Sequence, residues 1–421
     1  SERVSFDTIK DGVVFGRVVR TDKGLAIVQC PKSSIILKTI EKADMASKDT
    51  LSDFIAIGEK NYPAEHYLMD LSTHGGGYKN IRTNYQYVLY DSESAQVMTL
   101  DELKDVLGKA PSKFDILGFD ACLMAMAEVM YGFKDSLNPA SGYFIGSPEA
   151  TSAYGWPYGS ILKSLAGEPS KTPEELAKEI VNLDAEYYKA KGITEELLCA
   201  IKLSKLEGIA KEFFDLSGEL AKVSEDPAAL IELKNIRASV LVYNDPSFVD
   251  LVDLCDLLAK SELKGNVKEK ASGVIAAVKE AVIDKGFTEG RVTQSGGISI
   301  FFPADKGKSD SWKDLKGNPY SNLAFAKAVP QWQAFLENFN ASLVPYLTNL
   351  QPDSGKAGVK VEARGFFGKE KGEVYIGGAE APVVSWKADK LEIKVPNGAK
   401  SGQLQVKVKD KKSNGIKFEV F

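Results

Sequence analysis

Histidine is the scarcest chemically active residue in this chain, with only two copies, His66 and His74, among 421 residues. Any reaction that needs an imidazole near neutral pH must therefore use one of these two side chains. Cysteine is also sparse, and its four copies are far apart, with no CxxC pair. This argues against a zinc site and against a dense disulfide framework. The four cysteines are Cys30, Cys122, Cys199 and Cys255.

Strong charge and long apolar runs are missing too. The net charge is -5, so electrostatics gives no reason to expect binding to nucleic acid or to an acidic membrane surface. No uninterrupted apolar run approaches the roughly 20 residues of a membrane span. The first residues, Ser1-Glu2-Arg3-Val4, do not have the pattern of a signal peptide.

The length of the chain predicts two or three domains. Apolar strand-like runs alternate with amphipathic helical patterns as far as residue 339, and helical patterns dominate from 206 to 285. Capping boxes begin two of the helices, at Thr99 and Thr172. Such alternation predicts an α/β domain with a mostly parallel sheet flanked by helices. The strands are expected at residues 67–72, 85–90, 114–119, 142–146, 197–203 and 297–302.

Two of these expected strands end in a useful side chain. Residues 67–72 lead into His74 and three glycines, and residues 114–119 lead into Cys122. Function collects at the carboxyl ends of strands in open α/β sheets, so we expect the imidazole and the thiol to meet at one edge. A histidine can activate a thiol and protonate the leaving group. A glycine N–H and the Cys122 N–H would suit the oxyanion of acyl transfer.

Each of these residues also has a plainer interpretation. A buried cysteine at a strand–helix junction is usually a small core residue, which is also what we expect for the other three cysteines. A histidine before glycines is often a turn residue, and His66, at the start of its strand, favours a structural role. Asp120, just before Cys122, suits a cap of the following helix.

Five separated motifs, in order, make the chain resemble the clostripain family of caspase-type cysteine peptidases. They are residues 74–77 (His-Gly-Gly-Gly), 119–124 (Phe-Asp-Ala-Cys-Leu-Met), 147–158, 246–251 and 295–303.

The resemblance implies a caspase-like domain over residues 1–343, with a helical insertion at about 204–285. It also implies endopeptidase activity after Arg or Lys through an acyl-enzyme. By motif position His74 is the general acid and base, Cys122 the nucleophile and Gly75 the second oxyanion donor. Asp120 matches the acidic residue of the pocket that selects Arg or Lys, and a buried carboxylate suits a long cationic side chain. Glu149 and Thr151 are further candidates for that pocket.

Other expectations follow from the same resemblance. Self-cleavage between the His and Cys strands is common in the family, and Lys79 and Arg82 are candidate processing sites. No cofactor is expected; calcium is possible, but the sequence locates no site for it. A secreted, cell-surface or periplasmic location is implied. The family's opening strand and helix are not recognisable here, so a separate N-terminal fragment of the same precursor is a possible partner.

Residues 344–421 differ in character, with short alternating strands separated by Gly, Pro and Asn. They predict a small immunoglobulin-like sandwich and resemble the IPT/TIG domain, which implies docking or stabilisation. The alternative for the whole chain is a catalytically silent binding protein on a caspase-like scaffold.

Overall fold

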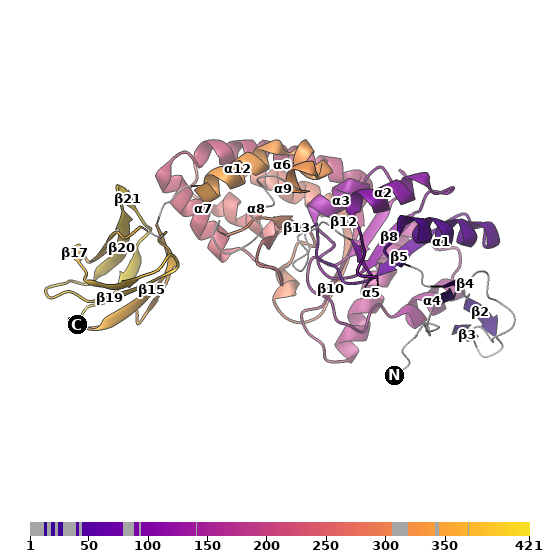
Figure 1. Ribbon diagram of the computed structural model, residues 1–421, viewed down its shortest axis with the longest axis horizontal. Helices are drawn as coiled ribbons and strands as arrows, with labels where there is room; N and C mark the ends of the chain where they lie inside the picture. Colours follow the sequence, from indigo (N-terminus) through magenta and orange to yellow (C-terminus); the bar gives the residue numbers. More distant parts are fainter. Residues whose placement is uncertain are drawn as a thin grey trace.

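The computed structural model describes residues 12–14, 18–21, 24–27, 39–41, 44–78, 88–91, 94–139, 141–304, 319–341, 345–368 and 370–421. Four short strands come first and form two antiparallel pairs: β1 (Gly12–Val14) with β4 (Thr39–Glu41), and β2 (Val18–Thr21) with β3 (Gly24–Ile27). Helix α1 (Lys48–Asn61) then leads into the main sheet (Figure 1).

The main sheet has five strands in the order β12-β10-β9-β8-β5. Strands β5, β8 and β9 run parallel, whereas β10 is antiparallel to both of its neighbours. Four of the six expected strands therefore lie in this sheet, but only two of its four strand pairs are parallel, and these contain both strand ends of interest. The strand expected at 85–90 appears in the described residues only as β6 (Leu89–Tyr90), which pairs with β7 (Val97–Met98) outside the main sheet. The bounds are β5 (Leu68–Ser72), β8 (Ile116–Asp120), β9 (Tyr143–Gly146), β10 (Leu197–Lys202) and β12 (Val282–Phe287).

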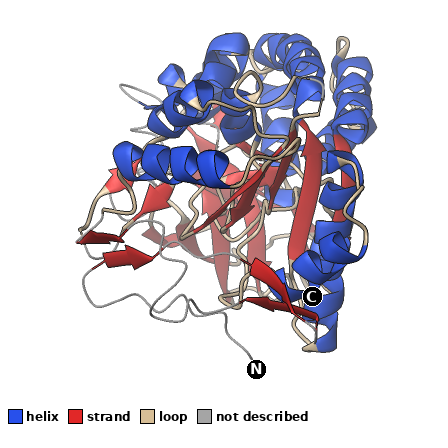
Figure 2. Cartoon of the chain, turned by 90° about the vertical axis from the view of Figure 1, so that its right-hand side faces the viewer, coloured by secondary structure: helices blue, strands red, loops and turns tan. Residues whose placement is uncertain are grey.

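Helices cover the two faces of this sheet (Figure 2). Alternate residues of β8 divide between two cores: Leu117 and Phe119 join the larger core with α2 (Leu100–Lys109) and α3 (Ala127–Phe133), whereas Ile116 joins a smaller one. The smaller core lies under α4 (Tyr158–Gly167) and α5 (Pro173–Ala190). This alternation follows from the period of two along a strand. It also places Asp120, an even-numbered residue, on the face beneath α4 and α5.

The structure confirms two of the predicted helix starts and differs at a third. Both predicted capping boxes form, at Thr99 for α2 and at Thr172 for α5. Helix α3, expected from Cys122, begins only at Ala127. The reason is that the N–H groups of Leu123 and Ala125 donate to the carbonyls of Glu149 and Ser147, at 3.0 and 2.9 Å. The segment after Cys122 therefore pairs with a neighbouring loop instead of coiling at once.

The region after β10 is mainly helical, with one small sheet inside it. Four helices pack together: α6 (Leu206–Val223), α7 (Pro227–Ser239), α8 (Leu251–Lys260) and α9 (Val267–Ala281). The strand expected near residues 297–302 forms as β13 (Ser299–Phe301), but it pairs with β11 (Phe248–Asp250) and not with the main sheet. The last helix is split at Val329 into α11 (Ala324–Ala328) and α12 (Pro330–Ala341), since Pro330 begins a new helix.

The C-terminal strands form two antiparallel sheets around a core of their own. The boundary expected at residue 344 falls within 342–344, outside the described residues. One sheet contains β14 (Tyr346–Gln351), β15 (Lys360–Phe366), β19 (Lys390–Lys394) and β18 (Val383–Trp386). The other contains β17 (Ala379–Glu380), β16 (Glu373–Ile376), β20 (Gly402–Val408), β21 (Lys411–Lys412) and β22 (Ile416–Phe418).

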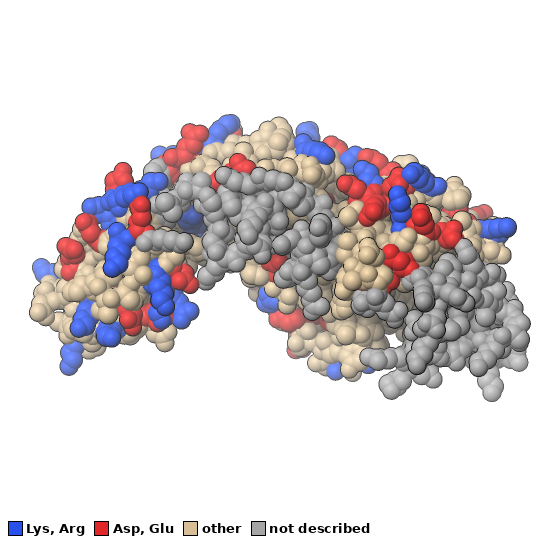
Figure 3. Space-filling model, in the orientation of Figure 1, with Lys and Arg blue, Asp and Glu red and all other residues tan. Residues whose placement is uncertain are grey.

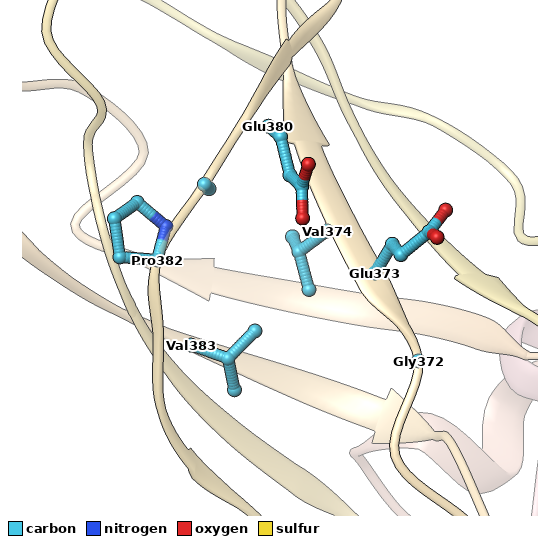
Figure 4. A pocket seen from close by; sticks show the side chains of 7 residues that line it. Gly372, Glu373, Val374, Glu380, Pro382 and Val383 are labelled. Atoms are coloured by element: carbon cyan, nitrogen blue, oxygen red, sulfur yellow. The ribbon is translucent and has the colours of Figure 1, made fainter.

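A shallow hollow opens between strands of this sandwich (Figure 4). It is lined by Glu373, Glu380, Pro382 and Val383, among others. Glu373 already accepts hydrogen bonds from Tyr375 and Lys407.

Candidate active site

The register between β5 and β8 brings the two predicted motifs together. Ser72 lies opposite Asp120, so the segments that follow both strands leave the sheet side by side. The Thr73 N–H donates to the Asp120 carbonyl at 3.3 Å. A side chain added to Gly75 would overlap the Cys122 carbonyl oxygen, so the two backbones touch there. His74, which lies between Thr73 and Gly75 in the sequence, has an exposed side chain.

The Cys122 thiol is half-buried and lies beside Thr151. The Thr151 N–H donates to Cys122 Sγ at 3.3 Å, and the Thr151 hydroxyl lies 3.5 Å from the same sulfur. Cys199 and Cys255 differ from it, because both are fully buried and burial raises their thiol pKa well above the usual value. Those two thiols are core residues, as expected, whereas Cys30 lies outside the described residues.

Asp120 does not cap the helix that follows it. Its Oδ2 accepts the Trp156 N–H at 3.1 Å and the Tyr158 hydroxyl at 2.8 Å, while the N-cap residue of α3 is Met126. The carboxyl is 7% exposed, and burial raises its pKa despite these hydrogen bonds. Gly155 packs on it so closely that an added Cβ would lie 2.7 Å from Oδ2.

Three further carboxyls lie around Asp120 that the sequence did not single out. Asp70, on the neighbouring strand β5, shares the Tyr158 hydroxyl, and burial raises its pKa to about 7. Asp184 on α5 and Glu196 just before β10 are 4% and 5% exposed. Burial is the main cause that raises their pKa, to about 8 for Asp184 and about 7 for Glu196, and repulsion from Asp120 adds to it.

Of these three carboxyls, only Asp70 could have been predicted from the sequence to lie near Asp120. Asp70 alternates with the buried Met69 and Leu71 on β5 and shares a face with Ser72, which lies opposite Asp120, so it was predictable as a residue on the same face as Asp120. Asp184 and Glu196 lie more than 60 positions beyond Asp120 in the sequence. The packing of α5 over the sheet brings Asp184 close, and the place of β10 in the sheet brings Glu196 close.

Glu149 is placed close to the thiol loop, but its charge is already compensated. Its Oε2 pairs with the Arg291 guanidinium at 2.9 Å, and its Oε1 accepts the N–H groups of Ala150 and Asn244. Glu149 and Thr151 therefore belong to one loop, but their side chains have different partners. Thr151 contacts the sulfur, and Glu149 ties the loop to Arg291.

The other candidate residues lie elsewhere. His66 Nδ1 lies 3.1 Å from Asp115 Oδ2, at the amino end of the strands and away from Cys122, which fits the structural role expected for it. Lys79 and Arg82 lie outside the described residues. Within the described ranges, no three His, Cys, Asp or Glu side chains are arranged to hold a metal ion, and no helix has the length and apolarity needed to cross a membrane.

Comparisons with known proteins agree with this geometry. A family model described as the clostripain family matches residues 13–339, and one described as the IPT/TIG domain matches residues 345–420. Clostripain of Hathewaya histolytica is 25% identical over 343 residues, which cover 69% of this chain and 61% of that protein. The chain therefore spans about three-fifths of the length of that relative.

Two solved structures share the fold of the larger domain. One is a secreted C11 cysteine protease from Bacteroides thetaiotaomicron in complex with an irreversible peptide inhibitor. Its TM-score is 0.56 at 19% identity, over 76% of this chain and 85% of that one. The other is an inactive zymogen C11 protease from Parabacteroides distasonis. Its TM-score is 0.53 at 23% identity, over 74% and 82% of the two chains.

Proposed function

The chain belongs to the clostripain family, and on that premise we propose that it is a cysteine endopeptidase that cleaves after Arg or Lys. The observation that carries the proposal is the contact between the Gly75 and Cys122 backbones, set by the parallel register of β5 and β8. The proposal is supported by the loop of His74 lying against the backbone of Cys122, whose thiol is half-buried, and by the buried carboxyl of Asp120 two residues earlier.

The proposed chemistry assigns one task to each group. His74 takes the proton from Cys122, and the resulting thiolate attacks the carbonyl carbon of the scissile peptide bond. The N–H groups of Gly75 and Cys122 donate to the oxyanion of the tetrahedral intermediate. His74 then protonates the leaving amine, an acyl-enzyme remains, and water hydrolyses it with His74 as base.

Selection of a basic residue before the cut is assigned to Asp120. Its carboxylate lies two residues before the nucleophile, and no Lys or Arg among the described residues forms an ion pair with it. A long cationic side chain would supply the missing positive charge. Thr151 borders the same site through its contact with the sulfur, and we assign Glu149 to holding that loop against Arg291.

Reactivity of the thiol and cleavage of peptides test this function together. In freshly reduced protein, Cys122→Ala should abolish release of a fluorophore from Arg- and Lys-terminated peptides. A small alkylating reagent at neutral pH should modify Cys122 before Cys199 and Cys255, which serve as internal controls because they are buried. An unreactive Cys122 and no cleavage by the wild type would instead favour the silent binding protein.

Location and processing complete the proposal. We assign the chain to the outside of the cell, since one of the similar structures is described as a secreted protease. Self-cleavage is assigned to Lys79 or Arg82. Strand β5 ends the described main sheet, so its outer edge would suit a strand from an N-terminal fragment of the same precursor. Intact mass and N-terminal sequencing of wild type and Cys122→Ala would show whether a cut depends on the thiol.

A further inference from the structure

Asp184 is a buried carboxyl with an unsatisfied oxygen. It lies on α5, is 4% exposed, and its Oδ1 has no hydrogen-bond partner in the structure as described. Buried polar groups are nearly always paired, so such an atom calls for an explanation. Glu196 interacts electrostatically with it and accepts the Ser152 N–H at 2.6 Å.

The surroundings of this pair are acidic. The charged groups that act on the pKa of Asp184 are Glu196 and Asp120, and Asp120 and Glu149 act on Glu196. On α5 itself, Asp184 also raises the pKa of the Tyr188 hydroxyl, although burial is the larger cause. Arg291 pairs with Glu149 and lies 3.7 Å from Glu195, and no Lys or Arg among the described residues forms an ion pair with Asp184 or Glu196. A cluster of this kind costs stability unless a cation enters it.

One loop connects the acid pair to the thiol. Within five residues, Thr151 contacts Cys122 Sγ, the Ser152 N–H bonds to Glu196, and Gly155 packs on Asp120. The Tyr188 hydroxyl, on α5 four residues after Asp184, donates to the Gly155 carbonyl at 2.9 Å. The loop therefore lines a continuous acidic region from the nucleophile past Asp120 to α5.

We infer that Asp184 and Glu196 form the far wall of the specificity pocket, accept hydrogen bonds from the terminal N–H groups of an arginine side chain, and make the site prefer arginine to lysine. The inference rests on the proposed peptidase function. A guanidinium carries five N–H donors on a planar fork, so it can donate to more than one carboxylate of this acidic group. The lysine ammonium offers three donors at a single point, so it satisfies one carboxylate well and leaves the others unpaired.

Kinetics with two matched substrates test the preference. Peptides that differ only in Arg or Lys before the cut are compared on wild type, Asp184→Asn and Glu196→Gln. The control is Glu186→Gln, which removes the same charge from an exposed position of α5. We expect Asp184→Asn to lower the Arg-to-Lys ratio of kcat/KM about tenfold, mostly through KM. An unchanged ratio, or equal losses on both substrates, would contradict the inference.

A binding experiment separates this inference from the proposed function. Cys122→Ala protein is titrated calorimetrically with an arginine peptide amide near pH 7, in buffers of different ionisation enthalpy. Burial raises the pKa of Asp184 to about 8 and that of Glu196 to about 7, so entry of a guanidinium that favours their charged forms should release protons. Asp184→Asn in the same background should bind the peptide more weakly and release fewer protons, and Glu186→Gln should match its parent in both.

The outcomes are distinct. If the wild type cleaves neither peptide, the proposed function fails, yet arginine-peptide binding that Asp184→Asn weakens would still support the acidic wall. Absence of arginine-peptide binding, or an affinity that Asp184→Asn leaves unchanged, would overturn the inference even in an active enzyme.

Discussion

Acidic side chains are treated in opposite ways in the two parts of this molecule. Around Asp120, the carboxyls of Asp120, Asp184 and Glu196 are buried, form no ion pair with a Lys or Arg among the described residues, and have raised pKa values. In the C-terminal sandwich acidic side chains are paired at the surface: Glu362 with Lys390 and Arg364, and Glu373 with Lys407. There the hydrogen bonds lower the pKa of both carboxyls.

This difference in pairing distinguishes a candidate binding site, near Asp120, from an ordinary solvated surface, on the C-terminal sandwich. On the visible face of the sandwich, Lys and Arg lie among Asp and Glu (Figure 3). Such pairs contribute little to stability and ask for no ligand. Buried carboxyls without cations lower stability, so their presence beside a thiol points to a positively charged ligand.

The largest expected effect comes from removing the central buried charge. Asp120→Asn should lower kcat/KM on Arg and Lys peptides by about 100-fold, since a charge-assisted pair with substrate is lost. Glu362→Gln, which removes the same charge from the sandwich, should leave kcat/KM unchanged. Steady-state kinetics on both variants gives the comparison, and a similar loss in both would abolish the distinction between the two regions.

Two glycines, one in each region, allow the effect of backbone strain to be separated from damage to the site. Gly155 and Gly398 have similar backbone angles, φ +71° and +77°, but an added Cβ meets Asp120 Oδ2 at Gly155 and open space at Gly398. Gly155→Ala should lower kcat/KM about tenfold, because it displaces the pocket wall as well as straining the backbone. Gly398→Ala should cost only about 1 kcal/mol of stability. Melting curves and kinetics on both variants separate strain from pocket damage.

Stability as a function of pH gives a third comparison. The pKa of Asp184 is about 8 when folded and near 3.8 when unfolded, so the unfolded chain binds fewer protons between these values and stability falls as pH rises. Asp184→Asn removes this loss. The variant should be more stable than wild type by about 1–3 kcal/mol at pH 9, and nearly equal to it at pH 4. Urea denaturation at both pH values measures it; equal stability at pH 9 would mean that the carboxyl is solvated.

The smallest effect is expected in the sandwich. Glu362→Gln breaks the pairs with Lys390 and Arg364, but all three groups are at the surface. The midpoint Tm should change by no more than about 2 °C. A larger change, in a melt monitored at 0.15 M salt, would show that this network is part of the sandwich's stability.

The local parts of the site could be predicted because they depend on neighbours in the sequence. Apolar runs that end in His74 and Cys122 fix the two strand ends, and the capping boxes at Thr99 and Thr172 fix two helix starts. The start of α3 could not be predicted. The segment after Cys122 pairs with the loop at Ser147 and Glu149, and a helical pattern does not show such a competing partner.

The sequence by itself determined which residues can act, because two histidines, one of them followed by three glycines, and one thiol just past a strand leave few choices for the chemistry. Tertiary structure alone decided their surroundings. The Glu149–Arg291 pair joins positions 142 residues apart, and the approach of Asp184 and Glu196 to Asp120 depends on how α5 and β10 pack with the rest of the sheet. Charge compensation is a property of distance in space, so composition and spacing could not show which carboxylates would be left without a cation.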